Sequence, residues 1–94
     1  MDILDLSRQR LTSLPENLPP TLKTLNVRNN RLTSLPDKLP LTLKILNVSG
    51  NKLTSLPDLP PTLEELDVAG SCFDFLPDLP STLKALNVSD NQCL

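Results

Sequence analysis

The stretch Thr-Leu-Lys-Thr-Leu-Asn-Val at residues 21–27 recurs three more times along the chain. It returns as Thr-Leu-Lys-Ile-Leu-Asn-Val at 42–48, Thr-Leu-Glu-Glu-Leu-Asp-Val at 62–68 and Thr-Leu-Lys-Ala-Leu-Asn-Val at 82–88, and a shortened copy, Ile-Leu-Asp-Leu, stands at 3–6. Self-similarity at a fixed short period is typical of folds in which each repeat packs only on its neighbours. The sequence therefore predicts a stack of similar coils.

The length and the repeat boundaries indicate one domain over residues 1–94. We divide it into a partial first repeat, 1–21, three full repeats, 22–42, 43–62 and 63–82, and a partial last repeat, 83–94. The period varies between twenty and twenty-one residues because Asn17 and Lys38 have no counterpart in the later repeats. Both extra residues fall between the two prolines of their repeat, where we expect a loop that tolerates insertion.

Within a repeat, the segment Leu25-Asn26-Val27 alternates apolar and polar residues, which predicts a very short strand with one buried face. Two prolines follow, Pro36 and Pro40, and each has a counterpart in the other full repeats. Proline fixes φ and favours extended structure in the residue before it, so we expect the return path to be extended and free of helix.

A short polar side chain recurs just after each predicted strand. Stacked in register, such side chains could form a ladder that satisfies buried backbone groups, because a short amide bonds readily to the backbone of a turn. The expected ladder consists of Gln9, Asn30, Asn51, Ser71 and Asn91. Ser71 should weaken it, since a hydroxyl is shorter and makes fewer bonds.

The pattern Leu-x-x-Leu-x-Val-x-x-Asn-x-Leu-x-x-Leu-Pro, closed by a second Leu-Pro, resembles a leucine-rich repeat. Its short period and paired Leu-Pro are similar to the subtype found in secreted bacterial effectors of the YopM and IpaH type. The resemblance implies an α/β solenoid that is here nearly all-β and extended. We expect a curved right-handed coil, with a short-stranded parallel sheet on the concave face, a polyproline-like convex side and no globular caps.

Members of this family bind proteins through the inner face, so the resemblance implies a protein–protein interaction module. The candidate partner-binding residues are Asp5, Arg8, Thr24, Asn26, Arg28, Ile45, Asn47, Glu65, Asp67 and Asn87. The Asp/Asn column among them is the best candidate for hydrogen-bonded recognition. Its alternative is that these residues only keep the face soluble and prevent edge pairing. A calcium site is disfavoured, because adjacent carboxylates are lacking.

The residue types give little support to catalysis, and we expect no enzyme activity, cofactor or metal. The chain has no histidine, and no serine or cysteine has a recognisable base beside it. Cys72 and Cys93 lack metal-ligand spacing. Two free thiols are the favoured interpretation, with a bridge between them as the alternative. Cys93 should fill an inward leucine position, whereas Phe75 is expected to face outward or to fold over the coil edge.

Charge is distributed unevenly along the chain. Residues 1–47 hold seven basic and four acidic residues, a net +3, whereas residues 48–94 hold two basic and seven acidic residues, a net −5. The overall charge of −2 gives no electrostatic reason to expect nucleic acid or acidic membranes as partners. Head-to-tail self-association through uncapped ends, in a homo-oligomer or structural repeat, is one alternative function. A truncated or engineered scaffold is another.

Proline or charge interrupts every apolar stretch, so we expect neither a signal peptide nor a transmembrane segment. A cytoplasmic location is therefore the default expectation. The alternative is an effector, or a fragment of one, secreted and delivered to a host cell.

Overall fold

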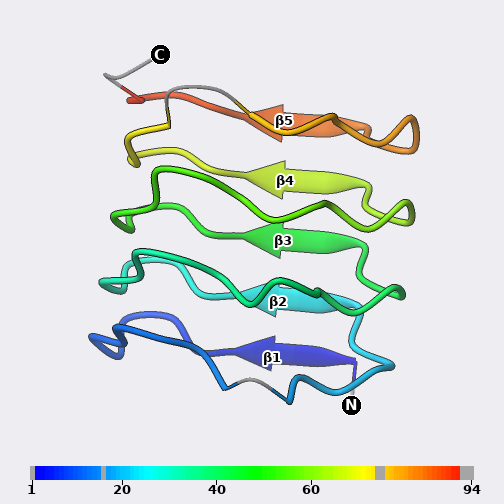
Figure 1. The fold of residues 1–94 in the computed structure, drawn as a ribbon, viewed down its shortest axis with the longest axis horizontal. Helices are drawn as coiled ribbons and strands as arrows, with labels where there is room; N and C mark the ends of the chain where they lie inside the picture. The colour runs from blue at the N-terminus through cyan, green and yellow to red at the C-terminus, as the bar shows by residue number, and fades with distance from the viewer. Residues whose placement is uncertain (1, 16, 74–75, 92–94) are drawn as a thin grey trace.

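A computed structural model describes residues 2–15, 17–73 and 76–91 and shows a parallel-strand solenoid (Figure 1). Five three-residue strands form one sheet in sequence order: β1 Ile3–Asp5, β2 Thr24–Asn26, β3 Ile45–Asn47, β4 Glu65–Asp67 and β5 Ala85–Asn87. All four neighbouring pairs are parallel and in register. The described residues include no helix. The predicted repeat architecture is confirmed.

The strands are short because the alternating pattern that makes them is short. The middle leucine of the central strands, such as Leu25 or Leu46, is fully buried, while its two neighbours face outward. The strand predicted at Leu25–Val27 begins one residue earlier, at Thr24. Val27 follows the strand, yet it is fully buried and its N–H donates to the carbonyl of Asn47 (2.9 Å). Inter-coil hydrogen bonding therefore continues past the end of the strand.

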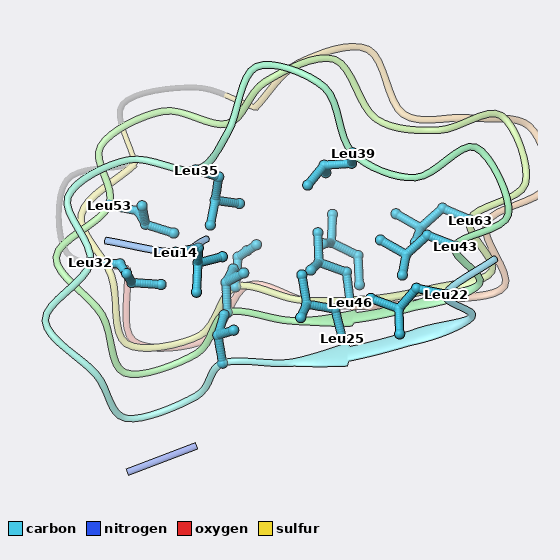
Figure 2. Close-up of a cluster of buried hydrophobic side chains, with 14 of the residues drawn as sticks. Leu14, Leu22, Leu25, Leu32, Leu35, Leu39, Leu43, Leu46, Leu53 and Leu63 are labelled. Atoms are coloured by element: carbon cyan, nitrogen blue, oxygen red, sulfur yellow. The ribbon is translucent and has the colours of Figure 1, made fainter. Parts of the chain in front are cut away.

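Leucines from the strands, the turns and the return segments meet between the two sides of each coil. Figure 2 shows Leu25 and Leu46 reaching inward from the strand side and Leu35 and Leu39 reaching inward from the return side. Corresponding side chains of successive repeats lie above one another, so the core is one continuous column. Phe73 is fully buried within it.

The second proline of each repeat closes the coil. The N–H of the leucine three residues later donates to its carbonyl, in the pairs Leu22–Pro19, Leu43–Pro40, Leu63–Pro60 and Leu83–Pro80 (3.1–3.2 Å). This is a β-turn that starts at a proline, and it delivers the chain to the next strand at the same place in every repeat. Repetition of one turn explains why the strands stay in register.

The cysteine expectation is wrong in part. Cys72 is exposed, but it is disulfide-bonded and not a free thiol. Cys93 and Phe75 lie outside the described residues.

Candidate functional site

The outward side chains of β1–β5 and of the turns after them form a continuous surface, which we call the strand face. The structure brings all ten candidate partner-binding residues together on it. Asp5, Arg8, Arg28, Glu65 and Asn87 are exposed, and Thr24, Asn26, Ile45, Asn47 and Asp67 are half-buried. Register places the Asp/Asn column side by side across all five strands.

Each side chain of the Asp/Asn column also shapes the turn that follows it. Its Oδ1 accepts a hydrogen bond from the N–H two residues later, as in Asn26 to Arg28 (3.1 Å) and Asp67 to Ala69 (3.0 Å). The same bond forms at Asp5, Asn47 and Asn87. This is the Asx-turn geometry that Asn and Asp favour. One oxygen of each side chain is therefore used structurally, which leaves Nδ2 or Oδ2 for a partner.

Asp5 shows the electrostatic effect of this arrangement. Hydrogen bonds from the side chain and backbone of Ser7 lower the pKa of the Asp5 carboxyl, and the charge of Arg28 lowers it further. The Asp5 carboxyl therefore keeps its charge to a lower pH than an aspartate without these hydrogen bonds.

A left-handed residue recurs three positions after the last strand residue. Arg8, Asn29, Gly50, Gly70 and Asp90 occupy it with φ between 57° and 68°. Glycine adopts this conformation without steric cost, and Asn and Asp adopt it more readily than other residues. Arg8 is the unexpected occupant, since a long side chain gains nothing locally from this backbone.

The carboxyl-terminal half of the strand face is hollowed. A depression of about 310 Å³ lies over β3, β4 and β5. Glu65 and Asp67 line its centre, with Ile45 on one side and the small Ala85 on the other. Outward positions of these three strands carry no Lys or Arg, so the hollow is acidic as well as partly apolar.

Beneath the turns, buried asparagines bond each coil to the one before it. Asn51 accepts the N–H of Leu32 at Oδ1 (3.0 Å) and donates from Nδ2 to the carbonyls of Val27, Val48 and Ser49 (3.0–3.2 Å). Asn30, which is buried, and Asn91, which is half-buried, make the corresponding bonds to their own coil and to the coil before it. We call this set, with the equivalent positions, the asparagine ladder.

Two members of the predicted ladder behave differently. The side chain of Gln9 is exposed, and its backbone N–H donates to Asn30 Oδ1 (2.9 Å). Ser71 is buried, and its hydroxyl donates one long bond to the carbonyl of Asn51 (3.4 Å). A serine hydroxyl cannot reach the groups that an asparagine amide bridges.

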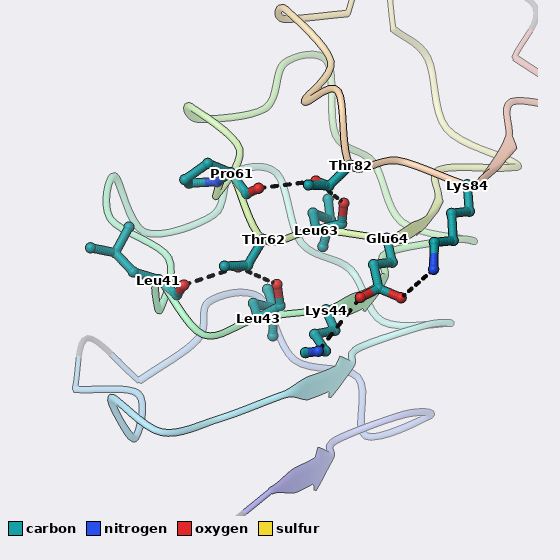
Figure 3. A network of polar contacts seen from close by, with 9 residues as sticks. All are labelled: Leu41, Leu43, Lys44, Pro61, Thr62, Leu63, Glu64, Thr82 and Lys84. Atoms are coloured by element: carbon teal, nitrogen blue, oxygen red, sulfur yellow. Dashed lines mark hydrogen bonds and ion pairs between the residues drawn. The ribbon is translucent and has the colours of Figure 1, made fainter.

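Sequence reasoning missed a second ladder, made by threonines at the start of the repeated stretch. Figure 3 shows Thr62 Oγ1 bonded to the carbonyls of Leu41 and Leu43 (2.9 and 2.8 Å), and Thr82 Oγ1 bonded to those of Pro61 and Leu63 (3.0 and 2.7 Å). Thr42 bonds likewise to Pro20 and Leu22. The signal was present, since a threonine precedes the first leucine of every full copy.

Figure 3 also shows Glu64 between Lys44 and Lys84, with both N–O distances 3.5 Å. Its neighbour Glu65 lines the strand-face hollow, so the two carboxylates do not act together. Among the described residues there is no group of three metal-ligating side chains, and no helix is long and apolar enough to cross a membrane. In the same ranges every buried side-chain nitrogen and oxygen has a hydrogen-bond partner.

Family models match two parts of the chain. Residues 20–61 match the model described as "Leucine Rich repeats (2 copies)", and residues 80–94 match "Leucine Rich repeat". No curated protein matches the chain.

Solved structures of bacterial proteins are similar to nearly the whole chain. The leucine-rich repeat domain of a Shigella effector is 49% identical over 97% of this chain, with a TM-score of 0.94. YopM from Yersinia enterocolitica is 47% identical over 98% (TM-score 0.92), and the leucine-rich effector protein YopM from Yersinia pestis is 37% identical over 96% (TM-score 0.76). The chain spans 41%, 20% and 31% of these three structures, respectively.

Proposed function

The chain belongs to the leucine-rich repeat family, with repeats of the bacterial effector type, and on this premise we propose that it binds a partner protein through its strand face. The observation that carries the proposal is the row of outward side chains on five registered strands. Neighbouring parallel strands lie about 4.8 Å apart, so the row covers about 20 Å. A surface of this size can form part of a specific protein interface.

The chemistry of the strand face supports a protein ligand. It combines amide and carboxylate groups with exposed aliphatic side chains such as Ile3, which is 65% exposed. Most of the Asp/Asn column is held rigidly by its own turn bonds, so little conformational entropy is lost when a partner binds. A side chain of the partner can fit into the hollow over β3–β5.

The family is generally a non-enzymatic interaction scaffold, and the described residues contain no arrangement that we would assign to catalysis. We therefore propose that the chain acts by binding. Since similar structures are bacterial effectors by name, we further propose that it is an effector, or part of one, that acts after delivery to a host cell.

The test is a pair of charge-matched variants that leave the turn-shaping residues intact. Ile45→Arg/Ala85→Arg places two long cations on the strand face. Leu41→Arg/Ser81→Arg places two on the return side, in the turns that lead into the same two strands, β3 and β5, where Leu41 is 71% exposed. A host protein is first captured from cell extract on the parent chain, purified, and its affinity is then measured by biolayer interferometry.

The strand-face variant should bind the purified partner at least about tenfold more weakly, because its arginines occupy the interface. The return-side variant should stay within about twofold of the parent. Equal affinity of the parent and the strand-face variant would refute the proposal. Head-to-tail association of the oppositely charged halves stays a separate prediction: sedimentation velocity at low salt should then show oligomers that high salt dissolves.

A further inference from the structure

Five cationic side chains lie along one edge of the stack, in turns that follow the strands and not on the strands themselves. They come from the turns after β1, β2 and β3, and all are exposed: Arg8, Arg10, Arg28, Arg31 and Lys52. We call this set the basic edge. The turn segments 7–13, 28–34 and 49–55 hold these five basic residues and no Asp or Glu.

Backbone hydrogen bonds fix the basic edge in space. The N–H of Arg31 donates to Leu11 (2.8 Å) and that of Lys52 to Leu32 (2.9 Å), so Arg10, Arg31 and Lys52 stand at equivalent positions of adjacent coils. At the parallel-strand spacing, this column is about 10 Å long. Arg8 lies beside Arg28, to whose carbonyl its N–H donates (3.0 Å).

The chain itself does little to neutralise these charges. Within the described residues, the ion pairs involve only Glu64 with Lys44 and Lys84, and none involves the basic edge. Asp5 lies near enough for the charge of Arg28 to lower the pKa of its carboxyl, and that carboxylate is already hydrogen-bonded to Ser7. Like charges at this spacing repel one another, and an external anion removes that repulsion.

Backbone geometry adds an independent observation. Arg8 and Arg10 both have φ of 57°, in the left-handed region. Two of the later repeats place Gly50 and Gly70 at the position of Arg8. A residue in a sparsely populated conformation suggests a functional reason for its side chain. Here that side chain adds a cation to the basic edge.

We propose that the basic edge binds an acidic segment of a protein partner, a short run of Asp and Glu side chains. The planar guanidinium groups of the four arginines suit bidentate contact with carboxylates. The edge ends after three coils, and residues 48–94 carry a net −5, so a long polyanion such as nucleic acid would meet repulsion beyond Lys52. A short acidic segment fits the length of the patch.

This inference rests on the proposed function, since it gives the chemistry of one part of the same partner. The probe is a fluorescein-labelled octapeptide of glutamate, titrated with the chain at 50 mM NaCl and followed by fluorescence anisotropy. The edge variant is Arg10→Gln/Arg31→Gln/Lys52→Gln. Its control is Lys23→Gln/Lys38→Gln/Lys44→Gln, which removes three exposed cations from other surfaces of residues 1–47.

The edge variant should bind the peptide at least about tenfold more weakly than the parent, whereas the control should change by about threefold or less, because only general charge is lost. Equal loss in both variants, or no binding of the peptide to the parent, overturns the proposal. Tighter binding of an eight-nucleotide thymidine strand than of the peptide assigns the edge to nucleic acid and also overturns it.

Sedimentation velocity tests whether a second copy of the chain occupies the basic edge. A salt-sensitive dimer of the parent that the edge variant abolishes would show that a second copy occupies the edge, which contradicts the proposal. A parent that is monomeric, or that forms an oligomer which the edge variant leaves unchanged, supports it. Failure in any arm leaves the strand-face test intact, because Ile45→Arg/Ala85→Arg retains all five cations of the basic edge.

Discussion

The third and fourth repeats, 43–62 and 63–82, solve the same structural problem differently. Asn51 and Ser71 occupy equivalent positions and are almost equally buried, at 6% and 8% exposure. Asn51 makes four hydrogen bonds to two coils, whereas Ser71 makes one long bond to the coil before it. The backbone nevertheless keeps its register through the fourth repeat. No single ladder is therefore essential for register.

Apolar packing offsets part of the difference. The fourth repeat places Phe73, fully buried, where the third repeat has Leu53. An aromatic ring buries more apolar surface than a leucine and so contributes more to stability. The fourth repeat thus relies more on packing and less on polar bonds than the third.

Removal of the stronger polar connection should have the largest effect. Asn51→Ala is expected to lower the free energy of unfolding by about 3 kcal/mol, because it leaves buried backbone groups of two coils without partners. Ser71→Ala should cost less than about 1 kcal/mol. Urea unfolding followed by circular dichroism measures both. Similar losses would show that the two positions are equivalent despite their different bonds.

Alanine at the left-handed position should destabilise the third repeat more than the fourth. A Cβ on Gly50 would lie 2.3 Å from Asn29 Oδ1, whereas the nearest atom to a Cβ on Gly70 is 3.5 Å away. Both glycines have positive φ, so both alanine variants carry backbone strain. Gly50→Ala should cost slightly more than Gly70→Ala, which should cost about 1 kcal/mol, because the clash at Gly50 is with the end of the exposed Asn29 side chain, which can turn away. The reverse order in thermal unfolding would contradict this reading.

An asparagine at position 71 should make the polar bonding of the fourth repeat more like that of the third. Ser71→Asn is expected to raise the free energy of unfolding by about 1 kcal/mol, since the new side chain can bond the third coil as Asn51 bonds the second. The comparison variant is Asn51→Ser, which should destabilise. If Ser71→Asn lowers stability, Phe73 has left no room for the larger side chain.

The bonds of the threonine ladder should contribute equally to stability at Thr62 and Thr82. Thr62→Val and Thr82→Val should each cost about 0.5 kcal/mol, because one hydroxyl hydrogen is shared by two carbonyls and valine keeps the volume. Thr33→Val, at an exposed position outside the ladder, is the control. Unequal losses at Thr62 and Thr82 in denaturant titrations would show that the fourth repeat is altered beyond its turn.

The repeat period was sufficient to predict the strands, the inward leucines and the return path without helix, since one pattern was repeated with a fixed length. Local rules also placed Asn30 and Asn51 in a ladder. The turn-shaping role of Asp67 and the rest of the Asp/Asn column was missed. Their exposure on a strand suggested recognition, and the Asx turn was not considered. Thr62 was missed because its acceptors lie nineteen and twenty-one residues earlier. The disulfide of Cys72 contradicts the expected free thiol.

Within residues 2–15, 17–73 and 76–91, the side chains of both ladders bond to their own coil or to the coil before it: Asn51 bonds Leu32, Thr62 bonds Leu41, and Asn91 bonds Phe73. This gives the molecule a direction of assembly. A chain that leaves the ribosome amino-terminus first offers each new coil backbone donors and acceptors that already exist. Translation can then add and dock one coil after another, and folding need not wait for the last residue.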